Sequence, residues 1–343
     1  MFRFRHLFLA VASFLLCALS VFQAQAPLTV RVATVAPENS EWHDALRQLH
    51  GTLQEKTSKR VALRINAGGI QGSEKAVIDR MLTGGPVDAS LLTANGLAMI
   101  DDSFNVFGIP FFFQSEAEMR FVQERLTPLL ATRLETKGFR LLAWGEGGWV
   151  QLFSKQPLKT LADVKRVKLF SSDGNDRMIQ WYKANGFNAV AMPENEIMKQ
   201  LKALNGVEAV PIPPYPAQLL GLYRDAPYML QVQVAQLVGA FIMTTNSWSK
   251  LSEADREVLL NASKVMQTRL EREVPKKDAA AIEEMRKEGR DLKVTMLDAK
   301  ASAEFRTEAE RMTAAMSGSI VPKDVFDAAL RERNAYRARS GKP

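Results

Sequence analysis

The sequence predicts an α/β protein of two domains with a ligand cleft between them, and three observations support this fold class. The chain has 343 residues, enough for two domains of ordinary size after removal of a leader. Strand and helix patterns alternate in two separate regions, as expected for parallel sheets covered by helices. Extended segments followed by a long helical pattern then predict strands that cross between the domains as a hinge, and a helix that spans both.

The first 26 residues have the organisation of an export signal. Arg3 and Arg5 precede an apolar run from Leu7 to Val21, and the segment ends in Ala24-Gln25-Ala26, a small-x-small sequence. We therefore expect cleavage after Ala26 and a mature protein in the periplasm. The single cysteine of the chain, Cys17, lies in this leader, so we expect no disulfide and no cysteine nucleophile in the mature protein.

Composition and motifs argue against several functional classes. The formal net charge is +7, with Lys and Arg interspersed among Asp and Glu, which is typical of a solvated surface and predicts no nucleic-acid partner. His43 and His50 lie about two helical turns apart, too far to share one metal ion. Because G-x-S-x-G, H-E-x-x-H and a cysteine nucleophile are all missing, we expect no enzyme, metal or cofactor.

The N-terminal region predicts strand, helix, strand, helix and strand in that order. Residues 28–34 alternate apolar and polar side chains, and Ser40 is placed to cap a helix with one apolar face. Residues 61–66 form the second predicted strand, Ser73 opens the second helix, and residues 87–93 form a buried strand. Short connections between these elements imply a parallel sheet.

The same alternation recurs in the second half of the chain. We expect strands at 166–170, 188–192 and 208–212, separated by helices at 175–185 and 194–204. Ser172 or Asp173 is the expected N-cap of the first of these helices. Residues 229–245 then form one or two extended segments.

The C-terminal part is predominantly helical. Ser252 followed by Asp255 resembles a capping box and opens a long helix through Glu288, in which Pro275 should produce a kink or a division. The apolar stripe of this helix is expected to comprise Val258, Ala262, Val265, Met266 and Leu270. A strand at 292–297 and helices at 301–316 and 321–337 complete the chain.

We place the two domains on discontinuous segments because the extended segments and the long helix connect them. Domain I comprises residues 27–150 with about 240–275, and domain II comprises 151–239 with about 276–343.

Several segments resemble, in order and spacing, the motifs of the solute-receptor subunits of TRAP transporters, the DctP family. The segments are LTVRVATVAPENSEWHDAL (28–46), GGIQGSEKAVIDRMLTGGPVDASLL (68–92), FGIPFFFQSEAE (107–118), WGEGGWVQLFSKQPLKTLADVK (144–165) and its continuation to Phe170, and AMPENEIMKQLKALNGVEAVPIPP (191–214). The resemblance extends over essentially the whole mature chain. It implies a two-domain periplasmic solute-binding-protein fold that captures a small solute and delivers it to small and large integral membrane subunits. Uptake would be driven by an ion gradient without ATP.

The chain departs from the family pattern where the family holds its ligand. Phe170 occupies the position of the principal carboxylate-anchoring arginine, and Val150 that of a second common arginine. Pro211 to Tyr215 replaces the usual acidic or amide cleft residues. Because a carboxylate in a closed cleft requires a charge-assisted partner, these changes predict a neutral or apolar solute rather than a typical dicarboxylate.

The resemblance and the pattern together give the candidate ligand contacts. The expected apolar wall is Trp149, Phe170, Met192, Ile212 and Tyr215. The expected polar contacts are Glu38, Asn39, Asn95, Glu146, Gln151, Ser171, Ser172, Asp173 and Asn175. Phe170 and Trp149 are also compatible with ordinary packing between the domains.

Two alternatives remain open at the level of sequence. The same receptor class could bind an organic acid through Lys168, Arg177 or Arg224, or through backbone N–H groups of residues 171–175 at the start of a helix. A receptor-like protein without transport activity could instead act in signalling or as a scaffold.

Overall fold

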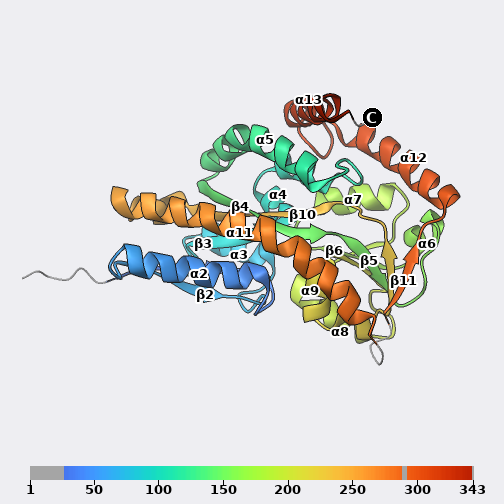
Figure 1. Ribbon diagram of the computed structural model, residues 1–343, viewed down its shortest axis with the longest axis horizontal. Coiled ribbons are helices and arrows are strands. Elements are labelled where there is room, and N and C mark those ends of the chain that lie inside the picture. Colours follow the sequence, from blue (N-terminus) through green and yellow to red (C-terminus); the bar gives the residue numbers. More distant parts are fainter. Residues whose placement is uncertain (1–26, 288–291, 342–343) are drawn as a thin grey trace, which may run out of the picture.

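The computed structural model describes residues 27–287 and 292–341, so the predicted export signal lies outside the described residues. Two mixed β-sheets, each covered by helices, make up the two domains (Figure 1). This architecture confirms the predicted α/β class. No helix in the described ranges is both long and apolar enough to cross a membrane.

The first sheet has the strand order β2-β1-β3-β10-β4. β1 (Leu28–Ala33) pairs in parallel with β2 (Val61–Asn66) and β3 (Ala89–Thr93), whereas β10 (Gln236–Thr244) runs antiparallel between β3 and β4 (Phe139–Trp149). The connecting helices are α2 (Glu41–Lys56) and α3 (Glu74–Leu82). Ser40 and Ser73 cap them as predicted, each accepting a hydrogen bond from a backbone N–H of the first turn.

The second sheet has the order β11-β9-β5-β8-β6-β7. Its strands are β5 (Gln151–Ser154), β6 (Leu169–Ser172), β7 (Ala189–Met192), β8 (Ala209–Ile212), β9 (Tyr228–Gln231) and β11 (Lys293–Met296). β8, β6 and β7 are parallel to one another, as the predicted alternation requires, and β5 is antiparallel to β8 and β9.

Further helices cover both sheets. Those before β6 are α4 (Ala94–Ile100), the 3₁₀ helix η1 (Asp102–Gly108), α5 (Glu116–Thr136) and α6 (Leu161–Arg166). Those after it are α7 (Asp176–Ala184), η2 (Glu194–Glu196), α8 (Ile197–Lys202), α9 (Pro214–Leu219), η3 (Leu222–Arg224), α10 (Thr245–Ser249), α11 (Glu253–Met285), α12 (Ala299–Met316) and α13 (Lys323–Ser340).

The chain crosses between the two sheets at two adjacent points. Val150 links β4 to β5, and residues 232–235 link β9 back to β10. The two crossings are hydrogen-bonded, because Val150 N donates to the Ala235 carbonyl (2.9 Å) and Val234 N donates to the Val150 carbonyl (3.0 Å). α11 packs on α2 and β4 of the first domain and on α9 of the second, and it runs across the molecule in Figure 1. The predicted hinge strands and spanning helix are therefore present.

The long helix can be compared with its prediction in two details. Pro275 does not divide α11, which is continuous from Glu253 to Met285 and is capped by Ser252, and the predicted alternative of a kink stays a prediction. Val265 is 56% exposed, and the buried stripe instead includes Leu259. The helix covers two domains in turn, so a single regular stripe does not describe its buried face. The predicted end at Glu288 lies outside the described residues.

The start of β6 also differs from its prediction. Arg166 belongs to the last turn of α6, because Thr160 and Asp163 form a complete capping box that nucleates a helix there, and the strand begins only at Leu169. The cap of α7 is Asn175, whose side chain accepts a hydrogen bond from Met178 N, rather than Ser172 or Asp173. α13 packs on α5 of the first domain, and the exact domain boundaries stay a prediction.

Candidate functional site

Two cavities lie between the domains on either side of Phe170. The Asn95 cavity, of about 250 Å³, is bounded by α4, η1, β6, α7 and α12. The Trp42 cavity, of about 230 Å³, is bounded by the loop after β1, the start of α2, η2, β8 and α9. Phe170 and Pro211 line both, so they form the partition between the cavities.

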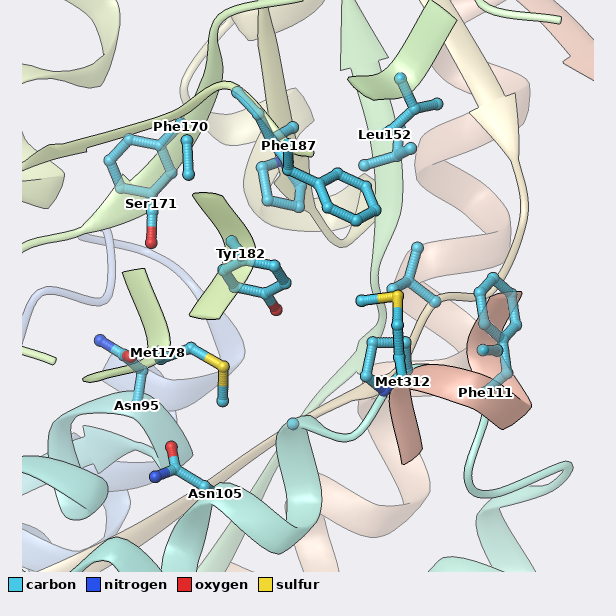
Figure 2. A pocket seen from close by; sticks show the side chains of 18 of the residues that line it. Asn95, Asn105, Phe111, Leu152, Phe170, Ser171, Met178, Tyr182, Phe187 and Met312 are labelled. Atoms are coloured by element: carbon cyan, nitrogen blue, oxygen red, sulfur yellow. The ribbon is translucent and has the colours of Figure 1, made fainter. Parts of the chain in front are cut away.

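The Asn95 cavity is mostly apolar with polar groups at its margins. Its polar lining side chains are Asn95, Asn105, Ser171, Ser172, Tyr182 and Glu308, and its aromatic and sulfur-containing ones include Phe104, Phe111, Phe170, Met178, Phe187, Phe305 and Met312. Figure 2 shows Asn95 and Asn105 at one end of the view, Phe170 and Ser171 at the other, and Tyr182 between them. Such a lining suits an apolar body that carries a few polar atoms.

The Trp42 cavity is equally apolar. It is lined by Val35, Ala36, Pro37, Ser40, Glu41, Trp42, Gly68, Gly69, Thr93, Gly147, Val150, Phe170, Glu194, Asn195, Ile197, Val210, Pro211, Ile212, Pro213, Tyr215, Pro216, Leu220, Leu237 and Val274. The Trp42 ring is held in place because its Nε1 donates to the Glu146 carbonyl (2.6 Å).

Neither cavity has a lysine or arginine among its described lining residues. The carboxylate of Glu308 lines the Asn95 cavity but is already neutralised by partners outside it. Arg311 donates to Glu308 Oε1 (2.7 Å) and Lys165 donates to the same oxygen (2.6 Å). These hydrogen bonds, with that from Arg311 the stronger, lower the pKa of Glu308 to about 2.

A buried carboxyl pair connects the two domains beside the Trp42 cavity. Glu74 at the start of α3 is 1% exposed and accepts hydrogen bonds from Thr93 N and Thr93 Oγ1, both at 2.6 Å. Its own backbone N–H donates to Glu194 Oε2 across the cleft (3.4 Å). Burial and then repulsion by Glu194 raise the pKa of Glu74 to about 8, and burial likewise raises the pKa of Glu194. Burial therefore keeps a proton on Glu74 at neutral pH.

A second polar link crosses the cleft beside the Asn95 cavity. Asn175 Nδ2 donates to Asn105 Oδ1 (2.9 Å) and to Asn95 Oδ1 (3.2 Å). Asn95 and Asn105 belong to the first domain, whereas Asn175 caps α7 of the second. This amide cluster ties the two domains together on one side of Phe170, as the carboxyl pair does on the other.

The crossing strands are fixed by a buried carboxyl group of the spanning helix. Asp278 of α11 accepts hydrogen bonds from Tyr215 N (2.9 Å) and from the backbone of Trp149. Burial raises its pKa to about 7. The backbone approaches so closely that a Cβ added at Gly148 would lie 1.7 Å from Asp278 Oδ2.

Six of the residues predicted to contact ligand line the cavities. Asn95, Ser171 and Ser172 line the Asn95 cavity, Ile212 and Tyr215 line the Trp42 cavity, and Phe170 lines both. They come from both domains and converge although they are far apart in sequence. Asn175, another predicted contact, lies behind the Asn95 cavity through its bonds to Asn95 and Asn105.

The other candidates lie outside the lining of both cavities. Glu146 is ion-paired with Arg120, and Gln151 accepts hydrogen bonds from Val232 N (2.9 Å) and Gln233 N (3.2 Å). Trp149 lines a separate hollow, Met192 is buried in the core of the second domain, and Asp173 N donates to the Met192 carbonyl. Glu38 and Asn39 are exposed, although the Asn39 carbonyl accepts from Tyr215 Oη (3.2 Å). Their roles in binding stay predictions.

The three basic side chains that the sequence offers as partners for an organic acid also lie outside the cavities. Lys168 Nζ donates to the Asn205 carbonyl (2.9 Å), and Arg177 is bound to Asp102. The Arg224 guanidinium lies over the ring of Tyr223. In the described part of the chain no group of three or more His, Cys, Asp or Glu residues could hold a metal ion.

Sequence reasoning missed several lining residues. Asn105 stands alone in the apolar run 104–113, and an isolated amide in such a run is a recognisable sign of a buried polar contact. Glu74 directly follows the cap of α3, where an acidic residue is common, so its position in the sequence gives no sign of burial. Met312 and Glu308 come from α12, more than a hundred residues after β6 in sequence, and no local signal brings them to the site.

Comparison of the sequence with known proteins identifies the family of this chain. Residues 32–318 match the profile of the bacterial extracellular solute-binding protein family 7, DctP. The 2,3-diketo-L-gulonate-binding periplasmic protein YiaO of Escherichia coli is 27% identical over 176 residues, which are 51% of this chain and 53% of that protein.

Solved structures share the fold over nearly the whole chain. A TRAP periplasmic solute-binding protein of Xanthobacter autotrophicus with bound β-D-galacturonate has a TM-score of 0.81 at 18% identity, covering 89% of this chain and 99% of that one. The sugar acid binding protein of Advenella mimigardefordensis in complex with galactonate has a TM-score of 0.83 at 17% identity, covering 90% and 98%. At these identities the likeness concerns the fold.

Proposed function

The chain belongs to the bacterial extracellular solute-binding protein family 7, and from this premise we propose that it is a periplasmic TRAP-type receptor for a neutral or apolar small organic solute. The solute binds between the two domains, in the cavities on either side of Phe170. The domains close over it by bending at the crossing strands near Val150. The loaded receptor then delivers the solute to the small and large membrane subunits of the transporter.

The composition of the cavity walls is the observation that carries this proposal. Phe170 forms the shared wall of both cavities, and their described linings contain no lysine or arginine. A carboxylate buried there would lose its hydration without gaining a charge-assisted partner, which costs several kcal/mol. A solute with an aromatic or aliphatic body loses nothing comparable on entering the cleft.

The second candidate is the same receptor with an organic acid as its solute. The bound ligands of the two structural neighbours, galacturonate and galactonate, favour it. Because Lys168, Arg177 and Arg224 are engaged elsewhere, the acid would depend on backbone N–H groups after β6 and on amide or hydroxyl donors. At such a site, acids should bind more weakly than at a site that holds the carboxylate with an arginine.

Calorimetric titration of the mature protein separates the two candidates. The protein should first be unfolded and refolded so that carried solutes are removed. We expect heat of binding with neutral aromatic probes such as acetophenone, and none with galacturonate, glucuronate or benzoate at the same concentrations. Binding of the acids alone would contradict the proposed solute class and favour the second candidate.

A further inference from the structure

The hydroxyl of Tyr182 faces the Asn95 cavity. Tyr182 lies on α7 four residues after Met178, so the two side chains share one face of the helix, and both line the cavity. Figure 2 shows the Tyr182 hydroxyl directed into the space between Met178 and Met312. Tyr182 Oη has no hydrogen-bond partner among the described residues.

This hydroxyl can be reached from the cavity. Some side-chain oxygen atoms of the described chain, such as those of Asp173 and Gln236, are both enclosed by protein and unpaired, but Tyr182 Oη is not one of them. The lining around it includes Met178 and Met312, which offer no strong acceptor for its proton. A hydroxyl that the protein neither encloses nor pairs is available to a polar atom of a bound solute.

The ring that carries the hydroxyl is held on two sides. Trp181 and Phe187 contact the Tyr182 ring edge to face, with ring centroids 5.6 Å and 5.9 Å away. Burial of the side chain raises the pKa of Tyr182, so the phenol keeps its proton and remains a donor at neutral pH. Because the donor is already in position, binding requires little reordering of this side chain.

The rest of the lining determines which acceptor suits this donor. The described lining residues of the cavity include no lysine or arginine, so a carboxylate would find only neutral donors such as Tyr182 Oη. A neutral oxygen requires no counter-charge, and one hydrogen bond from the phenol satisfies it. Phe170 and Phe187 offer apolar surface to the body of the same molecule.

We propose that Tyr182 is the specificity-determining residue of the Asn95 cavity, and that its hydroxyl donates a hydrogen bond to a neutral oxygen of the solute, such as a carbonyl, on an aromatic or aliphatic body. The body lies against Phe170 and Phe187, and the oxygen lies beside α7. The inference rests on the proposed function, and it adds which cavity holds the solute and which polar group the solute carries.

Replacing Tyr182 by phenylalanine tests the donor, because the change removes the hydroxyl and leaves the ring. By titration calorimetry or ligand-observed NMR, we expect the refolded wild type to bind acetophenone about five- to tenfold more tightly than ethylbenzene, which has the same ring but no carbonyl. In Tyr182→Phe this ratio should fall to about one, because acetophenone binding weakens and ethylbenzene binding does not. Tyr228→Phe removes a hydroxyl outside both cavities and should leave the ratio unchanged.

Urea unfolding of the same variant separates a role in binding from a role in stability. Because Tyr182 Oη bonds to no described residue, its removal should leave the urea midpoint of the refolded protein unchanged when no probe is added. Acetophenone, added at one concentration to both proteins, should then raise the midpoint of the wild type more than that of Tyr182→Phe.

The assignment is overturned if Tyr182→Phe keeps the preference for acetophenone, if ethylbenzene binds the wild type as tightly as acetophenone, or if neither probe binds. A lower urea midpoint of Tyr182→Phe without a probe would also contradict it, because the hydroxyl would then have a partner within the protein. A failure of the proposed function is distinct from these results. It would appear as binding of acids in place of every neutral probe, in the wild type and in Tyr182→Phe alike.

Discussion

Phe170 forms a wall of both cavities, and under the proposed function its side chain determines which charge the cleft accepts. It is 7% exposed and is the second residue of β6, directly before Ser171 and Ser172, where a longer cationic side chain would reach either cavity. Sequence reasoning located this position because a framework of neighbouring motifs fixes it. It could not place Asn105 or Met312 in the same cavity as Phe170, because their approach is a product of the tertiary fold alone.

Restoring a cation at this position should restore acid binding. We expect Phe170→Arg, combined with Glu194→Gln so that the new guanidinium is not neutralised, to bind benzoate about tenfold or more tightly than the wild type. Titration calorimetry measures the difference. Leu82→Arg, at a position that is 59% exposed, adds the same charge away from the cleft and should show no gain. An unchanged benzoate affinity in the folded double variant would contradict the role given to Phe170.

Glycine at position 148 is required by the contact between the hinge and the spanning helix. Its φ is +96°, and a Cβ there would meet Asp278 Oδ2 at 1.7 Å. We expect Gly148→Ala to lower the free energy of unfolding by about 2 kcal/mol or more, measured by urea denaturation.

Gly51→Ala is the matched control for this substitution. Gly51 lies within α2 with nothing within 4 Å of an added Cβ, so alanine there should raise stability by about 0.5–1 kcal/mol. If both substitutions changed the free energy of unfolding equally, the close approach of residue 148 to Asp278 would not be what makes glycine necessary there.

Helices whose N-caps are recognised in the sequence begin where they are predicted, whereas α6 and α9 are missed. Ser40, Ser73 and Ser252 cap their helices as predicted because capping depends on the residue and its first turn. The sequence predicts a strand over 166–170, but the capping box of α6 places Arg166 in a helix and the strand begins at Leu169. α9 begins at Pro214 in a proline-rich run that gave no helical pattern, although proline is well suited to the first turn.

The spanning helix should be sensitive to its cap because both domains pack along it. Ser252 accepts a hydrogen bond from Asp255 N (3.1 Å) at the start of α11. We expect Ser252→Ala to cost about 1 kcal/mol of stability, and Ser252→Asp, which retains an acceptor, to cost less. Chemical denaturation of both variants checks the order, and an equal loss in the two would contradict the capping role.

At the scale of the whole molecule, the closed arrangement depends on polar links across the cleft. Glu74 N to Glu194, Asn175 to Asn95 and Tyr215 Oη to the Asn39 carbonyl each join one domain to the other. The crossing strands and α11 supply the remaining connections. The two-domain plan could be predicted from the order of the elements, whereas these links could not, because each joins residues distant in sequence.

The carboxyl link should make stability depend on pH. Glu74 has a pKa of about 8 when folded against an ordinary 4.5, so the folded protein holds a proton that the unfolded chain releases. Its contribution is complete below pH 4.5 and is lost as pH rises through about 8. We expect the free energy of unfolding to fall over this window by on the order of a few kcal/mol.

Urea denaturation between pH 5 and pH 9 measures this dependence. Glu74→Gln mimics the protonated carboxyl and should reduce the slope of the profile, leaving the fall in the same direction that Asp278, with a pKa raised to about 7, and Glu194, whose pKa burial also raises, still cause. Glu38→Gln, at an exposed position, should leave the profile unchanged. An identical slope in wild type and Glu74→Gln would show that Glu74 does not hold the proton.

The most direct measurement is a crystal structure of the mature protein purified without unfolding, so that its solute is retained, with mass spectrometry of the same sample to identify the molecule. The predicted result is a neutral solute in the Asn95 cavity against Phe170. A carboxylate-bearing solute paired with a lysine or arginine side chain would contradict it.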